Sequence, residues 1–124
     1  MNKSSLTFGT LFAFLAVALG AFGAHGLKTM LTPQALAVWH TAVQYQMFHA
    51  LALLIIGLLA RFLSDARMLV WAVRSMIIGV VLFSGSLYVL ALTGIGKLGM
   101  ITPFGGIAFL LGWLFLLVAV WNAE

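Results

Sequence analysis

Six polar side chains interrupt an otherwise apolar stretch, and they are the residues of this chain best suited to proton transfer or ligand binding. They are His40, Thr41, Gln44, Tyr45, Gln46 and His49. A histidine titrates near neutral pH, so it can relay a proton or bind a ligand. An uncompensated polar group in lipid costs about 2–7 kcal/mol. We therefore expect these side chains to line a packed interior, a water-filled vestibule or a ligand site.

Five of the six fall on one half of a helical cylinder when successive residues are set about 100° apart. Gln46 falls on the other half, with Trp39. We expect the polar half to face other helices or water. His25 ends the preceding apolar stretch on the same side of the membrane. The residues predicted to form an outward-opening vestibule or ligand site are therefore His25, His40, Gln44, Tyr45 and His49.

Hydrogen bonding between helices is the alternative use of these residues, and the pattern favours it slightly. Each such bond contributes only about 0.6 kcal/mol in measured membrane proteins. His49 lies near the middle of its apolar stretch, and a neutral imidazole offers one donor and one acceptor. We expect its hydrogen-bond partner to come from the first or the third span.

Cofactor and metal chemistry receive less support from the spacing. His40 and His49 lie about 13 Å apart along one helix, so a heme iron would need His49 together with His25 or with another subunit. The acidic residues Asp65 and Glu124 belong to the opposite side of the membrane. We therefore expect no metal and no cofactor. No nucleophile, base and orienting group occur together, so we do not expect an enzyme.

The composition fixes the class of protein. Hydrophobic residues make up 65% of the 124 residues and charged residues only 6%, with no cysteine, and the mean hydropathy is +1.22. This is the composition of a membrane protein with one domain, residues 1–124. The absence of cysteine excludes disulfides and thiol catalysis. The formal charge of +4 is dispersed along the chain, which argues against binding to nucleic acid.

Four apolar stretches are long enough to cross a bilayer, since each gives about 29 Å of helix. They are residues 6–24, 41–60 (in a helix that begins at 33), 75–93 and 103–121. The first is interpreted as a span and not as a signal peptide. Thr32-Pro33 and Thr102-Pro103 are typical helix starts. The predicted fold is an all-α integral membrane bundle of four transmembrane helices.

The basic residues predict the orientation of the chain. An even number of spans places both termini on one side, with Lys3, Arg61, Arg67 and Arg74. Lys28 and Lys97 fall on the other side. Because cytoplasmic segments carry an excess of Lys and Arg, we expect both termini in the cytoplasm.

The two halves of the chain align without a gap at a shift of 70 residues. Gly9 then falls on Gly79, Gly26 on Gly96, and the Thr-Pro pairs coincide. A true duplication would give a parallel two-plus-two repeat, but apolar stretches also align by chance, and the two explanations are about equally supported. Small residues at helical spacing predict close helix packing. The residues expected at these contacts are Gly20, Gly79, Ser86 and Gly112.

Several motifs together carry a resemblance to a known family. They are the segments 20–27, 39–53, 85–88 and 102–106. With them the chain resembles the YgdD-type small bacterial inner-membrane proteins, an uncharacterised family with eukaryotic transmembrane relatives. The resemblance implies a four-span protein of the bacterial inner membrane, and it implies no activity.

The first functional hypothesis is a small oligomeric permease or channel-like protein whose second span lines an outward vestibule. Its partners would be the lipid bilayer and further copies of the chain, and its substrate is not identified. The alternative is a non-transporting structural or assembly factor that binds a membrane protein or lipid, and a weaker one is a heme or quinone carrier. A continuous water-filled cavity that reaches His49 favours the permease. A polar face sealed by other helices favours the structural factor.

Overall fold

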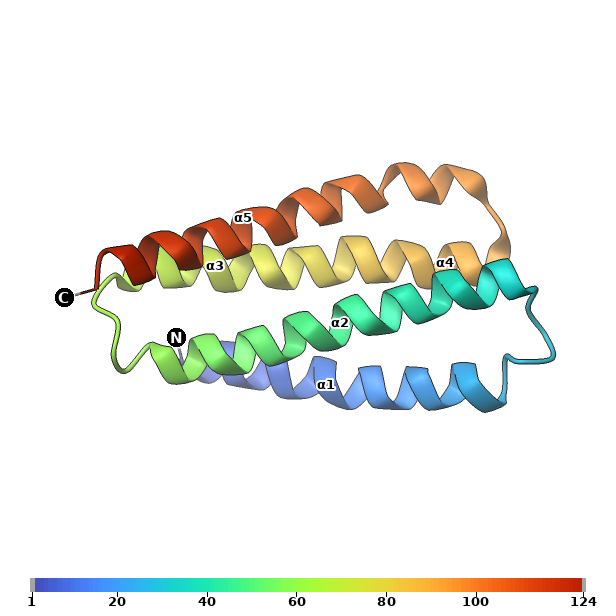
Figure 1. The fold of residues 1–124 in the computed structure, drawn as a ribbon, viewed down its shortest axis with the longest axis horizontal. Coiled ribbons are helices and arrows are strands. Elements are labelled where there is room, and N and C mark those ends of the chain that lie inside the picture. Colours follow the sequence, from blue (N-terminus) through green and yellow to red (C-terminus); the bar gives the residue numbers. More distant parts are fainter. Residues whose placement is uncertain (1, 124) are drawn as a thin grey trace.

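The computed structural model describes residues 2–123, and this part of the chain contains helices and no strand. The elements in chain order are α1 (Asn2–His25), α2 (Pro33–Leu59), α3 (Ala66–Gly79), the π-helical turn η1 (Val80–Ser84), α4 (Gly85–Thr93), the 3₁₀ helix η2 (Gly96–Met100) and α5 (Thr102–Trp121). α3, η1 and α4 form one continuous rod (Figure 1).

Four stretches of helix are long and apolar enough to span a membrane. They are Lys3–His25, Pro33–Leu59, Ala66–Thr93 and Gly96–Trp121. The predicted bundle of four transmembrane helices is therefore confirmed. Figure 1 shows the two ends of the chain at the same end of the bundle as the loop between α2 and α3.

The starts of α2 and α3 follow local capping chemistry, whereas Thr102 at the start of α5 bonds the Ser86 hydroxyl and caps no amide. The Thr32 hydroxyl accepts a hydrogen bond from the Ala35 amide at 3.1 Å, which caps α2 just before Pro33 as predicted. The third span begins at Ala66 and not at residue 75, because the Asp65 carboxylate accepts from the Met68 amide at 3.2 Å and starts the helix earlier.

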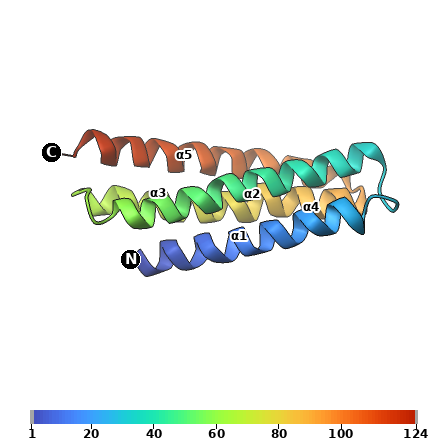
Figure 2. The same ribbon diagram turned by 60° about the horizontal axis from the view of Figure 1, so that its bottom comes forward.

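The helices lie in the order α1, α2, α3–α4, α5 across the molecule, with α1 and α5 at opposite outer edges in both views (Figures 1 and 2). The two most extensive interfaces join α1 to α2 and α3 to α5. α2 then connects the two hairpins through α4 and η1. The hydroxyl of Ser84, in η1, donates to the carbonyl of Ala42 at 2.7 Å and ties the hairpins together.

Glycines set the spacing between the second pair of helices. A Cβ at Gly79 would lie 2.3 Å from the ring of Phe109, and a Cβ at Gly105 would lie 2.3 Å from the backbone nitrogen of Phe83. Gly112 packs in the same way against Met76. Of the predicted packing residues, Gly79, Ser86 and Gly112 are buried, and Gly20 is half-buried against Val43. These small residues let the backbones of α3 and α5 approach closely.

The two hairpins repeat in order and direction but not in their contacts. Gly9 and Gly79 are equivalent under a shift of 70 residues, yet Gly9 faces Leu54 and Gly79 faces Phe109. Leu54 and Phe109 are not equivalent under that shift. The packing therefore gives no support to an internal repeat, which stays a prediction.

Candidate functional site: a lateral groove between α2 and α5

One face of α2 forms a sealed polar centre with α4, which we define as Trp39 and Gln46 of α2 and Tyr88 of α4. The Trp39 indole nitrogen donates to the Leu19 carbonyl at 2.9 Å. The Gln46 side-chain amide donates to the Phe12 carbonyl at 2.9 Å, and its oxygen accepts from the Tyr88 hydroxyl at 2.6 Å. Trp39 and Gln46 are buried. This centre holds α1, α2 and α4 together by hydrogen bonds.

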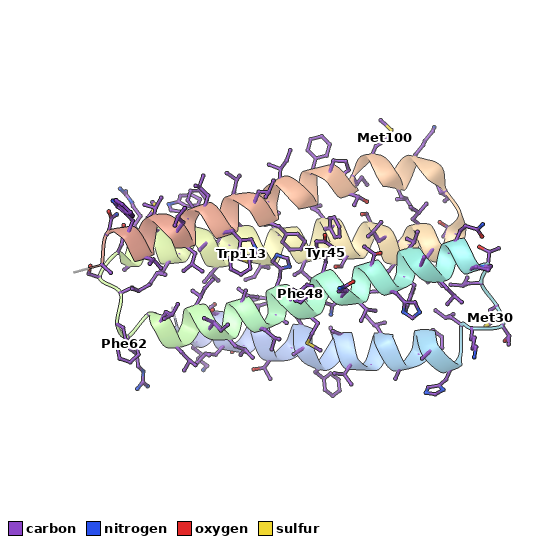
Figure 3. The ribbon with its side chains drawn as sticks, viewed as in Figure 1. Met30, Tyr45, Phe48, Phe62, Met100 and Trp113 are labelled. Atoms are coloured by element: carbon purple, nitrogen blue, oxygen red, sulfur yellow. The ribbon has the colours of Figure 1, made fainter. Side chains whose placement is uncertain are left out.

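Another face of α2 borders an open groove of about 450 Å³, which we call the lateral groove. It lies between α2, η1 and α5, and Tyr45 and Trp113 are seen there between α2 and α5 in Figure 3. Its lining residues are Tyr45, His49, Phe83, Pro103, Gly106, Ile107, Phe109, Leu110 and Trp113. The groove therefore has an aromatic wall and few polar atoms.

His49 closes the inner side of the groove, with only 5% of its surface exposed. Its Nδ1 lies 2.7 Å from the Tyr45 carbonyl, which can only accept, so Nδ1 carries the proton and donates. Its Nε2 is then the acceptor for the Trp113 indole N–H at 3.1 Å. Both ring nitrogens of a neutral imidazole are thus satisfied within the protein.

Three rings form the aromatic wall beside His49, namely Tyr45, Phe83 and Phe109. The imidazole stacks on Phe109 with centroids 3.6 Å apart and an interplanar angle of 11°. Tyr45 stands nearly parallel to both rings, at 12° to His49 and 22° to Phe109. Phe83 lies 4.6 Å from the Tyr45 ring.

Tyr45 differs from His49 in that its polar atom has no partner. The side chain is 40% exposed, and within residues 2–123 its hydroxyl forms no hydrogen bond. Tyr45 lies about 18 Å along α2, a helix of 27 residues that is about 40 Å long. Because α2 is long and apolar enough to span a membrane, the Tyr45 backbone lies near the middle of that span, where hydrocarbon offers its hydroxyl no water.

Comparison with known proteins identifies the family of this fold. A family model described as "Protein of unknown function (DUF423)" matches residues 19–106. The chain belongs to this family.

Curated relatives carry the name UPF0382 membrane protein. The chain is 50% identical over 117 residues to the YwdK protein of Bacillus subtilis, covering 94% of this chain and 95% of the relative. It is 45% identical over 114 residues to a relative in Haemophilus influenzae, covering 92% and 90%. No solved structure matches the chain. The family is thus DUF423/UPF0382, which corrects the assignment to YgdD-type proteins made from the motifs.

The structure brings together two of the five residues predicted for the vestibule. Tyr45 and His49 line the lateral groove. His25, His40 and Gln44 are exposed instead. The residues on the predicted polar half of α2 therefore do not converge on one vestibule: His49 is buried and bonded like Trp39 and Gln46, whereas His40 and Gln44 are exposed.

The partner of His49 is also different from the one expected. It comes from α5, as Trp113, and not from the first or third span. An indole N–H inside an apolar span needs an acceptor, and this is the sequence signal that could have pointed to Trp113. Phe83 and Phe109 carry no comparable signal, because an aromatic ring in a span is equally suited to lipid.

The described residues do not place enough ligand side chains together to hold a metal ion or a heme iron. Among residues 2–123 no group of three His, Asp or Glu side chains is placed to hold a metal, and Glu124 lies outside the described residues. Gln46 bonds to Phe12, so His25 lies about 20 Å further along α1 than the level of Gln46. His25 and His49 therefore cannot ligate one iron within a single chain. The aromatic groove suits a flat organic ring better.

Proposed function

We propose that the chain is a non-transporting membrane protein that binds a lipid-soluble molecule in the lateral groove. The ligand class is a neutral molecule with a flat ring and a carbonyl acceptor, as in a prenylated quinone. The observation that carries the proposal is the unpartnered hydroxyl of Tyr45 at mid-membrane depth, beside the aromatic wall. That hydroxyl can donate a hydrogen bond to a carbonyl, while the rings of Phe109 and Phe83 contact the apolar part.

The size of the groove favours a small molecule over a helix. A volume of about 450 Å³ falls in the range of about 300–1,000 Å³ usual for small-molecule sites. A transmembrane helix is about 10–12 Å wide with its side chains and needs a surface along its whole length. Since the groove opens laterally, a ligand can enter from the hydrocarbon without crossing water.

The arrangement of polar groups supports binding over the permease predicted first. A permease needs polar groups along a continuous path, but Trp39 and Gln46 are buried and bonded to neighbouring helices. His49 is likewise satisfied by its own bundle. We propose no catalytic step, because the groove contains no nucleophilic side chain that is hydrogen-bonded to a base.

Quenching of tryptophan fluorescence by a short-chain ubiquinone tests the proposal, since Trp113 lines the groove. The purified protein in phosphatidylcholine nanodiscs should show saturable quenching that Trp113→Phe largely removes. Tyr45→Phe should weaken the affinity about three- to tenfold, which is about 0.7–1.4 kcal/mol.

Tyr88→Phe is the matched control, because it removes a hydroxyl that bonds Gln46 and not one that lines the groove. It should leave the affinity unchanged. Equal weakening by both tyrosine variants, or quenching that never saturates, contradicts the proposed site.

We further propose that the protein lies in the bacterial inner membrane with both termini in the cytoplasm, as the basic residues predict. Cysteines introduced singly at Ser64 and Lys97 should be labelled from opposite sides of intact cells. Labelling of position 64 by an impermeant reagent from outside contradicts this orientation.

A further inference from the structure

A second hollow lies at the opposite end of the molecule from the α1–α2 loop, between α1 and α3. It has a volume of about 160 Å³ and is lined by Ser4, Val70, Val73, Arg74 and Ile77. The Arg74 guanidinium also lies over the Trp71 ring, 5.6 Å from its centroid. Arg74 and Ser4 therefore lie beside apolar residues in this hollow. None of its lining residues also lines the lateral groove.

The depth of Arg74 makes its charge unusual. The span Ala66–Thr93 has 28 residues and is about 42 Å long, so it extends about 6 Å beyond each side of a core of about 30 Å. Arg74 follows Ala66 by about 12 Å of helix, which places its backbone about 6 Å inside the hydrocarbon. A charged group at this depth needs a partner or must extend to the headgroups.

The protein supplies no such partner in its described part. Within residues 2–123 the one acidic residue is Asp65, and its carboxylate accepts from the Met68 amide and from the Asn122 side chain at 2.8 Å. Arg67 and Lys3 lie near the same end of the bundle and add positive charge. Within residues 2–123 no carboxylate therefore compensates the charge of Arg74.

We propose that this hollow binds the phosphate of an anionic phospholipid, with Arg74 and the Ser4 hydroxyl as donors. At about 160 Å³ the hollow has room for a phosphate group. The acyl chains then run along Val70 and Ile77, which line the hollow and are half-buried. The uncompensated positive charge favours an anionic headgroup over a zwitterionic one, because choline would add a second cation.

Native mass spectrometry of the protein released from micelles with equal amounts of phosphatidylglycerol and phosphatidylcholine tests this site. The protein should retain one phosphatidylglycerol, preferred at least about tenfold, or about 1.4 kcal/mol. Arg74→Gln should abolish the preference. Arg67→Gln makes the same change of charge at an exposed residue outside the hollow, and it should keep the preference.

A second variant tests the hollow without changing charge. Ser4→Trp fills it from the exposed end of α1 and should also release phosphatidylglycerol. Equal retention of the two lipids by the natural protein, or equal loss in Arg67→Gln and Arg74→Gln, overturns the proposal. Displacement of the lipid by millimolar inorganic phosphate overturns it too, since the site would then be one for a free anion.

Discussion

Tyr45 and Gln46 are neighbours on α2, yet they belong to opposite kinds of site. Gln46 is buried and uses its amide to join Phe12 and Tyr88. Tyr45 is 40% exposed, and within residues 2–123 its hydroxyl has no partner. One face of a single helix therefore serves cohesion between helices, while the adjacent face carries a donor that has no partner within residues 2–123. Polarity inside a membrane helix does not by itself distinguish these two uses.

The largest expected effect concerns the wall of the lateral groove that α5 forms. Gly105→Ala places a methyl group 2.3 Å from the Phe83 backbone nitrogen, and overpacking costs about 1–3 kcal/mol. We expect a marked fall in the melting temperature in detergent. Gly106→Ala is the control, because its nearest neighbour lies 4.0 Å away, and it should change stability by less than about 0.5 kcal/mol. Equal effects would mean that α5 does not pack on η1 as described.

The next effect concerns the sealed polar centre. Gln46→Leu removes two hydrogen bonds and leaves the Tyr88 hydroxyl without its acceptor. An unsatisfied buried group costs about 1–3 kcal/mol, so the free energy of unfolding should fall by about that amount. Gln44→Leu changes the same residue type at an exposed position and should have little effect. Similar losses from both would show that the centre is not sealed.

His49 lies between the two regions, and its effect should be smaller. His49→Phe keeps a ring that stacks on Phe109 but removes the acceptor for Trp113. We expect a loss of stability of about 1 kcal/mol or less, measured by thermal unfolding, with weaker quenching by quinone. A loss above about 2 kcal/mol with unchanged quenching would assign His49 to cohesion alone.

The smallest expected change in stability is that of Tyr45→Phe, and it is compared with that of Tyr88→Phe. Tyr45→Phe should leave the melting temperature unchanged, because its hydroxyl makes no bond within the described chain. Tyr88→Phe should reduce stability by about 0.6 kcal/mol, the average measured for hydrogen bonds between membrane helices, and by about 1.7 kcal/mol at most. A reversed order of the two melting temperatures would exchange the roles assigned to the two tyrosines.

The spans could be predicted from the sequence because lipid requires long apolar helices, and the start of α2 could be predicted because Thr32-Pro33 is a local signal. The sequence could not predict which face of α2 turns toward the other helices. A helical wheel groups polar residues but does not show which of them reach carbonyls of other helices, as Trp39 and Gln46 do. His40 lies in the N-terminal part of α2, where an exposed histidine can reach the membrane–water interface and needs no buried partner.

The π-helical turn at Val80–Ser84 implies a constraint on chain length. Such a turn holds one residue more than an α-helical turn, so the faces before and after it are offset by about 100°. This offset lets α3 pack mainly on α5 while α4 packs on α2. Loss of one residue here would turn α4 away from α2 and separate Tyr88 from Gln46. Across the family, this segment should therefore tolerate neither insertion nor deletion.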